Sequence, residues 1–380
     1  MNRIYMDNAA TTRVSEPVAQ AMMPYLTEVF GNPSSVHSFG REAHKALDHA
    51  RAQVARALGA EPKEIYFTGC GTESDNWAIR GAAYAHKDKG NHIITTTIEH
   101  HAVLHTCEQL EKEGFEVTYL DVDEYGLVDV KALEAAIRPT TVLITVMAAN
   151  NEIGTMEPIE EIGRVAREHK VLFHTDAVQA IGSVPFDVKR MNIDMLSLSG
   201  HKFHAPKGVG ALYIRSGVKI DRFIRGGAQE RGQRAGTENL ASIVGMGRAI
   251  ELAAQNLEAH NAKLSALRDR LYAGLAAHDA VEATVDVAPG SVEFLPNIVH
   301  VLVRGLESET LILRFDLRGF GVSGGSACSS HSLAPSHVLH ALGIDDDRAH
   351  GALRISMGRG TAEEDVDAFL GAVAGVLDWS

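Results

Sequence analysis

Short apolar runs rich in β-branched residues alternate along the chain with longer segments whose apolar residues recur at the period of an α-helix. Residues 42–58 belong to the second kind, because their apolar side chains fall on a single stripe. That stripe consists of Ala43, Leu47, Ala50, Val54 and Leu58. The predicted strands lie at residues 64–68, 92–97, 115–120, 141–147, 171–174, 195–199 and 210–214. This alternation predicts an α/β fold with a mostly parallel sheet and helices on both faces.

The C-terminal part of the chain follows the same alternation after a long helical passage. Residues 237–278 read as two helical stretches separated by a weak break, which predicts the hinge between two domains. Beyond it the pattern predicts a strand at 298–303, a helix at 308–317, a strand at 352–356 and a closing helix from about 362. A chain of 380 residues is long enough for two cores, so this tail is interpreted as a smaller α/β domain.

Composition and charge narrow the classes of function. The chain is 45% hydrophobic and 22% charged, and its formal net charge of −13 argues against binding nucleic acid. No apolar run approaches the length of a membrane span and the first residues hold no signal-sequence core, so a cytoplasmic protein without a membrane partner is expected. Cys70, Cys107 and Cys328 are too few and too widely spaced for a disulfide framework or a zinc site. A cysteine with a special role is therefore expected to be reactive.

The first candidate chemistry follows two of the predicted strands. Lys202 comes directly after residues 195–199, where small neighbours leave access for a Schiff base and hydroxyl and imidazole groups can hold a phosphate. Asp176 ends another strand, at the edge where open α/β sheets bind ligands. In a pyridoxal enzyme, Asp176 would pair with the pyridinium nitrogen and Gln179 would reach the phenolic oxygen. The simpler interpretations are a solvated surface lysine and an aspartate that caps the next helix.

Two further segments could contact the same cofactor. The glycine-rich turn at 68–74 precedes a helix predicted to begin near Glu73, and its backbone would let a phosphate approach the free amides of that helix, although many such turns bind nothing. His100 or His101 could lie flat on a cofactor ring and exchange protons near neutral pH. The residue pattern leaves open which of these two histidines faces inward.

Groups for a substrate come from later in the chain. Residues 150–152 form a turn or supply an amide to the cofactor or to a substrate carboxylate. Arg354 interrupts a predicted apolar strand, and a buried arginine needs an anionic partner such as a carboxylate held by two hydrogen bonds. These positions are therefore candidates for substrate binding.

Cys328 differs from the other two cysteines in its surroundings. Residues 321–330 are rich in glycine and serine, which predicts an exposed and mobile loop and suits a nucleophile that must visit both the cofactor and an acceptor. Cys70 and Cys107 are instead predicted to be small buried hydrophobic residues. The reactive thiol is therefore assigned to Cys328.

Taken together and in this order, these segments resemble the cysteine desulfurases of the NifS/IscS group, within the class V aminotransferase family of fold-type I enzymes that use pyridoxal 5′-phosphate (PLP). The resemblance covers nearly the whole chain, and the ordered set is far more specific than any one motif. The chain departs from many relatives at residues 323–326, which read Ser-Gly-Gly-Ser where those relatives have a second serine, and this is expected to loosen the loop. The motifs are Asp7-Asn8-Ala9-Ala10-Thr11-Thr12, Phe30-Gly31-Asn32-Pro33-Ser34-Ser35, Gly71-Thr72-Glu73-Ser74, Glu99-His100, Asn150-Asn151-Glu152-Ile153-Gly154, Ser199-Gly200-His201-Lys202 with Pro206-Lys207-Gly208, Arg231-Gly232 with Arg234-Ala235-Gly236-Thr237, Gly325-Ser326-Ala327-Cys328, and Leu353-Arg354 with Gly358-Arg359.

The resemblance implies a role for each site position. The catalytic groups would be Lys202, which binds PLP as a Schiff base, Cys328, which accepts the sulfur, and His100, which stacks on the cofactor ring in place of His101. The remaining cofactor contacts would be Asp176 at the pyridine nitrogen, Gln179 at the phenolic oxygen, Asn151, and Gly71, Thr72, Ser199 and His201 at the phosphate, with Thr237 reaching the phosphate from the second subunit of a homodimer. Asn151 and Arg354 would bind the carboxylate of the substrate.

The implied reaction converts L-cysteine to L-alanine and leaves a persulfide on Cys328. The sulfur would go to an iron–sulfur scaffold, including one that serves nitrogenase, or to another acceptor, and Cys328 would touch iron transiently during handover. The implied fold has a large PLP-binding domain at 13–257 with a seven-stranded sheet, and a small domain at 1–12 and 258–380 that carries the cysteine loop at 321–333. The alternatives are a selenocysteine lyase or aminotransferase of the same family and a non-catalytic scaffold for iron–sulfur assembly. The joint presence of Lys202, Asp176 and Cys328 argues against the scaffold.

Overall fold

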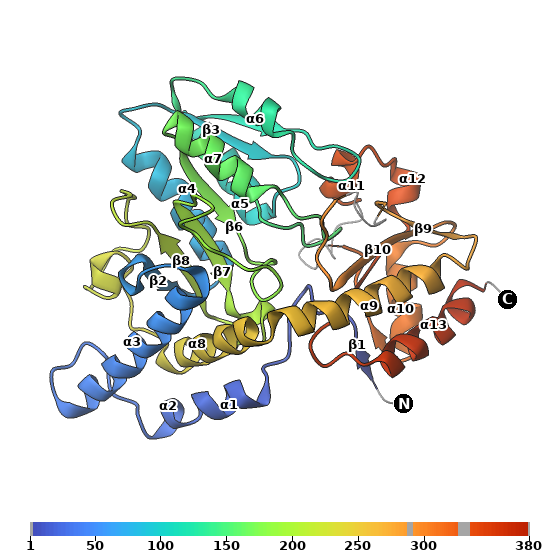
Figure 1. The fold of residues 1–380 in the computed structure, drawn as a ribbon, viewed down its shortest axis with the longest axis horizontal. Helices are drawn as coiled ribbons and strands as arrows, with labels where there is room; N and C mark the ends of the chain where they lie inside the picture. Colours follow the sequence, from blue (N-terminus) through green and yellow to red (C-terminus); the bar gives the residue numbers. More distant parts are fainter. Residues whose placement is uncertain (1–2, 287–291, 326–334, 379–380) are drawn as a thin grey trace.

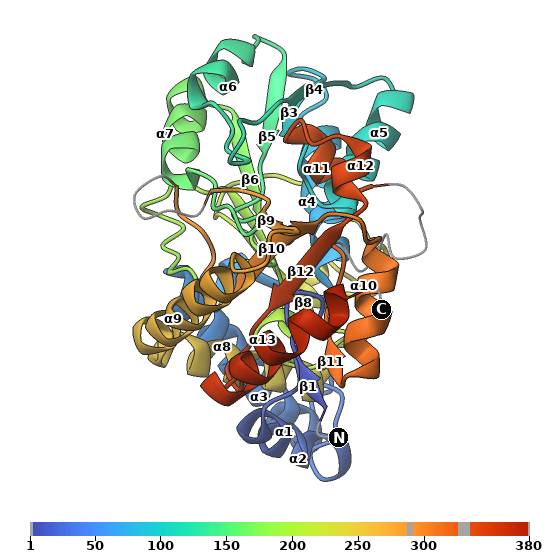
Figure 2. The same cartoon turned by 90° about the vertical axis from the view of Figure 1, so that its right-hand side faces the viewer.

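Two regions of secondary structure, each with its own hydrophobic core, lie side by side and are joined by a long helical passage (Figures 1 and 2). The structure is a computed structural model that describes residues 3–286, 292–325 and 335–378. Within those residues, no helix combines the length and the apolar character needed to cross a membrane.

A seven-stranded sheet forms the centre of the larger region, in the order β2-β8-β7-β6-β5-β3-β4. Strands β3 to β7 pair in parallel, whereas β8 runs antiparallel to both β2 and β7. The strands are β2 (Ile65–Thr68), β3 (His92–Thr96), β4 (Glu116–Leu120), β5 (Thr141–Thr145), β6 (Leu172–Asp176), β7 (Met195–Ser199) and β8 (Gly210–Ile214). The mostly parallel α/β sheet predicted from the sequence is therefore confirmed.

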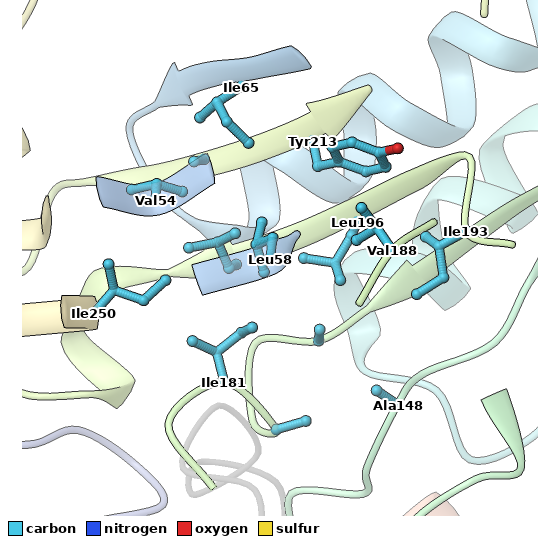
Figure 3. Packing of buried hydrophobic residues seen from close by; sticks show 14 of the residues in the cluster. Val54, Leu58, Ile65, Ala148, Ile181, Val188, Ile193, Leu196, Tyr213 and Ile250 are labelled. Atoms are coloured by element: carbon cyan, nitrogen blue, oxygen red, sulfur yellow. The ribbon is translucent and has the colours of Figure 1, made fainter. Parts of the chain in front are cut away.

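Helices cover both faces of this sheet, which is why its inner strands β3, β5, β7 and β8 are buried along their whole length. Residues of α3, α7 and α8 share one core with the sheet, seen in part in Figure 3, whereas α4 and α5 pack on the other face. The helices of this region are α1 (Glu16–Met22), α2 (Pro24–Thr27), α3 (Ser38–Leu58), α4 (Gly71–Ala85), α5 (His101–Lys112), α6 (Val130–Ala136), α7 (Ile159–His169) and α8 (Leu240–Gln255), with 3-10 turns at Pro62–Glu64, Gly200–Lys202 and Glu230–Gly232.

Helix α3 shows how the apolar pattern sets these elements. Every residue of its predicted stripe is buried against the sheet. The helix begins four residues earlier than predicted, because the His37 imidazole accepts a hydrogen bond from the Gly40 amide and caps it. It ends at Gly59, whose φ of 67° suits glycine and stops the helix.

The smaller region contains a three-stranded antiparallel sheet in the order β12-β10-β9 and the short parallel pair β1-β11. Its elements are β1 (Ile4–Tyr5), α9 (Leu257–Leu275), β9 (Val281–Ala283), β10 (Ile298–Val303), α10 (Ser308–Leu317), β11 (Phe320–Gly321), α11 (His337–Ala341), α12 (Asp346–Ala349), β12 (Ala352–Ser356) and α13 (Glu363–Leu377). A single residue, Asn256, separates α8 from α9, and Figure 1 shows the two helices running in sequence from the large sheet to the smaller region. The domain bounds at 12 and 257 and the hinge remain predictions.

The segment between β2 and α4 corrects two expectations. Helix α4 begins at Gly71 rather than near Glu73. Cys70 was predicted to be buried, but it is exposed, because it is the N-cap of α4 and its Sγ accepts a hydrogen bond from the Glu73 amide at 3.4 Å. The prediction for Cys107 is confirmed, since this residue is fully buried.

Candidate active site

A cavity of about 180 Å³ opens at the carboxyl ends of β6 and β7, where the large sheet faces the smaller region. Strands from both regions contribute to it, since Asp176 ends β6, Ser199 ends β7 and Arg354 lies in β12. The lining residues are Ala9, Ala10, Cys70, Gly71, Thr72, Asp75, His100, Met147, Ala149, Asn151, Asp176, Val178, Gln179, Ser199, His201, Lys202 and Arg354. The fold thus brings Lys202, Asp176, Gln179, His100, Asn151, Arg354 and the expected phosphate contacts together on one surface.

Lys202 lies on the 3-10 turn that follows β7. Its Nζ donates a hydrogen bond to the carbonyl oxygen of Ala9, in the N-terminal segment. The turn is tight because Gly200 packs closely on the chain that follows, and a Cβ there would lie only 3.0 Å from the side chains of Ala205 and Val209. The amine is therefore fixed at the sheet edge by local geometry.

Asp176 is the acidic residue that ends β6, and it is almost completely buried. Its Oδ1 accepts a hydrogen bond from the Val178 amide at 2.8 Å. Burial raises the pKa of the Asp176 carboxyl to about 6, against the opposing effects of that amide and of the Lys202 charge. At neutral pH Asp176 is mainly ionised, and a cation placed beside it in the cavity would be stabilised.

Behind Asp176 lies a second buried carboxyl, which sequence reasoning missed. Asp75 of α4 lines the cavity, and its Oδ1 has no hydrogen-bond partner among the described residues. Burial and the nearby Asp176 raise the pKa of Asp75 well above its usual range. His174 lies 3.7 Å from this carboxyl, and burial lowers the pKa of His174 to about 3. Burial thus disfavours the charged form of both groups.

The expected phosphate contacts surround the N-terminus of α4. Gly71 begins this helix, and a Cβ there would lie 2.7 Å from Val178, so the position has no room for a side chain. Ser199 and His201 reach the cavity from β7 and the turn after it. The Ser199 hydroxyl is buried and has no partner among the described residues, and the free amides of a helix N-terminus attract anions. A phosphate group fits this donor set.

The structure distinguishes the two histidines that the sequence could not. His100 lines the cavity and caps α5, with its Nδ1 accepting a hydrogen bond from the Ala102 amide at 3.1 Å. Burial, helped by the Lys202 charge, lowers the pKa of His100 to about 4, so its ring is neutral. The His101 ring instead packs against His105 and His337, with ring centroids 4.9 and 4.8 Å away.

Arg354 supplies the positive charge on the opposite side of the cavity. It is 1% exposed, and its guanidinium donates to the Asn151 carbonyl oxygen at 2.8 Å and to Asp7 Oδ1 at 3.0 Å. The sequence did not indicate that Asp7 pairs with Arg354, although residues 7–12 form one of the motifs of the family resemblance. No local pattern could have found this pair, because the two residues stand 347 positions apart in the sequence.

One predicted site residue among those described, Thr237, does not line this cavity. It is exposed, between the 3-10 turn Glu230–Gly232 and α8. Cys328 lies outside the described residues, but residues on either side of the cysteine loop are described next to the cavity. The Ser323 carbonyl accepts from the Arg354 amide at 2.7 Å, and the Ser336 hydroxyl donates to Glu152 at 2.6 Å.

The departure from relatives in this loop has a local explanation. Gly324 packs against Ser308, and a Cβ at Gly324 would lie 1.8 Å from the Ser308 hydroxyl oxygen. A serine at position 324 would therefore force Ser308 to move. Among the described residues there is no cluster of three or more side chains that could hold a metal ion.

Comparison with known proteins extends over almost the entire chain. The sequence profile of the aminotransferase class-V family matches residues 4–369. A cysteine desulfurase IscS from Methanosarcina thermophila is 56% identical over 98% of this chain and 92% of its own length, and a cysteine desulfurase from Nostoc sp. is 48% identical over 100% and 94%.

Solved structures agree with these sequence relatives. A NifS-like protein aligns with a TM-score of 0.92 and 40% identity, covering 99% of each chain. A structure described as SspA in complex with cysteine aligns with a TM-score of 0.82 and 39% identity, covering 94% of this chain and 99% of the other.

Proposed function

Because the chain belongs to the class-V aminotransferase family, we propose that it is a PLP-dependent cysteine desulfurase that converts L-cysteine to L-alanine and transfers the sulfur to Cys328. The observation that carries this proposal is the cavity in which Lys202 and Asp176 of the large sheet face Arg354 of the smaller region. An amine, a carboxylate and a guanidinium in that arrangement suit a cofactor with a basic ring nitrogen and a substrate with a carboxylate.

The residues of the cavity fit PLP. Lys202 would hold the cofactor covalently, Asp176 would contact its ring nitrogen, and the α4 N-terminus with Ser199 and His201 would bind its phosphate. The buried Ser199 hydroxyl and the Gln179 Oε1, which have no partners among the described residues, match the polar groups of such a ligand. When bound, PLP supplies an electron sink for the negative charge that develops at the substrate's α-carbon.

The chain's own residues then handle the protons. The ionised Asp176 keeps a proton on the ring nitrogen, which strengthens the electron sink. With the cofactor bound, the Lys202 amine would remove the proton from the substrate's α-carbon and would later return a proton to it. His100 stays neutral because of its low pKa, so it can pack on the ring without adding positive charge.

Substrate binding and sulfur transfer would use residues on the side of the cavity that includes Arg354. Arg354 and Asn151 hold the substrate carboxylate and so orient its side chain. The Cys328 thiolate forms a bond to the substrate sulfur, and the bond between that sulfur and the β-carbon breaks. The β-carbon would keep the electron pair and take up a proton, and once a proton is also returned to the α-carbon, alanine leaves and a persulfide remains on Cys328.

The same proposal includes a homodimer and a protein acceptor. Thr237 does not line the cavity of its own chain and would reach the phosphate of a second copy. Several large hydrophobic side chains between residues 23 and 39 are exposed, and a dimer interface would cover them: Met23, Leu26, Phe30, Val36 and Phe39. The acceptor is an iron–sulfur scaffold or another sulfur carrier, and following which purified candidate gains sulfur from L-cysteine identifies it.

The test of the function compares the wild type with Cys328→Ala. The wild type is expected to release alanine from L-cysteine and to form protein-bound sulfur in a reductant-sensitive form. Cys328→Ala should lose sulfur transfer but keep the visible absorbance of the bound cofactor, because its cofactor contacts are intact. Unchanged sulfur transfer in this variant would refute the assignment of Cys328.

A further inference from the structure

Asp7 occupies one side of the guanidinium of Arg354, the residue proposed to bind the substrate carboxylate. Its Oδ1 accepts a hydrogen bond from Arg354 at 3.0 Å, and the side chains of Asp7 and Arg354 are 18% and 1% exposed. A charge so deeply buried is stable only when it is paired. His300, directly opposite Arg354 on β10, cannot supply a negative charge, and burial lowers its pKa to about 3. In the substrate-free protein, Asp7 therefore balances Arg354.

The Asp7 backbone is fixed relative to the cavity by its neighbours. Asp7 bridges to Ser356 of β12, and the Asn8 amide donates to the Ser356 carbonyl oxygen at 3.1 Å. A few residues further along, the Ala9 carbonyl accepts from Lys202 and the Thr12 hydroxyl donates to the His201 carbonyl at 2.8 Å. The backbone of this segment is thus held by residues of both regions, which keeps Asp7 beside Arg354.

We propose that Asp7 is a positioning residue that orients Arg354 and lowers the affinity of the site for the carboxylate of substrate and product. This inference rests on the proposed function, in which Arg354 binds that carboxylate. A guanidinium has enough donors for two carboxylates, but the two negative charges repel each other across it. Weaker binding of this kind acts on L-cysteine and L-alanine alike, so it raises KM and speeds the release of alanine.

The first test is Asp7→Asn, which keeps the shape and an acceptor oxygen but removes the charge. Equilibrium binding of L-alanine to the cofactor-loaded enzyme is followed through the visible absorbance of the cofactor. The dissociation constant is expected to fall by roughly tenfold, and KM for L-cysteine should fall with it while kcat does not rise. Asp367→Asn, which breaks the exposed Arg270–Asp367 pair in the smaller region, is the matched control and should change neither value.

The second part of the test places Asp7→Asn in an Arg354→Gln background. The charge of Asp7 acts through Arg354, so in that background the substitution should change the dissociation constant of L-alanine by less than about twofold. Asp7→Ser, which also removes the charge and leaves room for a water, is measured in the same way if Asp7→Asn does not fold.

Equal affinity for L-alanine in the wild type and the charge-removing variant would overturn the proposal, as would the same shift in the Arg354→Gln background. Binding of L-alanine does not require desulfuration. If the wild type binds L-alanine but forms no alanine from L-cysteine, the proposed function is contradicted, whereas the inference about Asp7 and Arg354 is not.

Discussion

The two walls of the cavity present different charged groups. On the wall formed by the large sheet, Asp176 and Asp75 are buried side chains with raised pKa values, and the amine of Lys202 lies on the same wall. On the wall from the smaller region, the buried guanidinium of Arg354 faces the cavity and is balanced by Asp7. A ligand with a cationic ring nitrogen and a substrate carboxylate is therefore oriented by charge as well as by shape.

The two aspartates of the large-sheet wall differ in their surroundings. Asp176 has a pKa of about 6, because a backbone amide and Lys202 offset part of the cost of its burial. For Asp75, burial and the nearby Asp176 outweigh the opposing effect of a hydrogen bond with Ser197, and its pKa is raised well above the usual range. Two aspartates on one surface are thus expected to play different parts, one as an anion and one as a neutral acid.

The larger effect is expected at Asp176. Asp176→Asn removes the charge opposite the ring nitrogen of the cofactor, so kcat/KM for L-cysteine should fall on the order of 10²–10³-fold. The measurement is a steady-state assay of alanine release, normalised to bound cofactor. A loss of less than about fivefold would show that the large-sheet wall does not act through the charge of Asp176.

The smaller effect is expected at Asp75, where an amide replaces a carboxyl whose uncharged form is favoured by burial. Activity of Asp75→Asn should stay within about threefold of the wild type. Stability should respond to pH instead. Since the pKa of Asp75 is raised in the folded state, the unfolded chain releases this proton first, and the unfolding free energy of the wild type falls as pH rises above the unfolded pKa.

Asp75→Asn lacks that titration, so its Tm relative to the wild type should increase between about pH 4 and about pH 7. Thermal unfolding of the cofactor-free proteins across this range measures the difference. A Tm difference that stays flat or decreases would mean that Asp75 is ionised in the folded protein, and that the two aspartates are alike.

Much of the fold was predictable because its elements have strong local patterns. The strands Met195–Ser199, Gly210–Ile214, Ile298–Val303 and Ala352–Ser356 and the helix Ser308–Leu317 were predicted at the bounds that the structure has. Among the elements for which no bounds were predicted, β1, β9, β11 and α2 are two to four residues long. Runs this short carry no readable period, and they form because distant segments pair with them.

Some residues of the site could likewise be predicted from local sequence patterns, and others could not. The residues that follow strands, such as Asp176 and Lys202, could be found because the carboxyl ends of parallel strands meet at one edge. Asp75 sits inside a helix that reads as ordinary, and the pairing of Asp7 with Arg354 exists only in the folded chain. Cys70 was misjudged because neighbouring glycines do not reveal whether a residue caps a helix at the surface or lies inside.

The central claim is that Cys328, and no other thiol, receives the sulfur. Cys70 is a demanding internal control, because it is exposed and lines the cavity. The most direct measurement is peptide mapping by mass spectrometry after incubation with L-cysteine and alkylation. One added sulfur atom is predicted on the peptide that contains Cys328 and none on those with Cys70 or Cys107. Sulfur on the Cys70 peptide, with none on the Cys328 peptide, would contradict it.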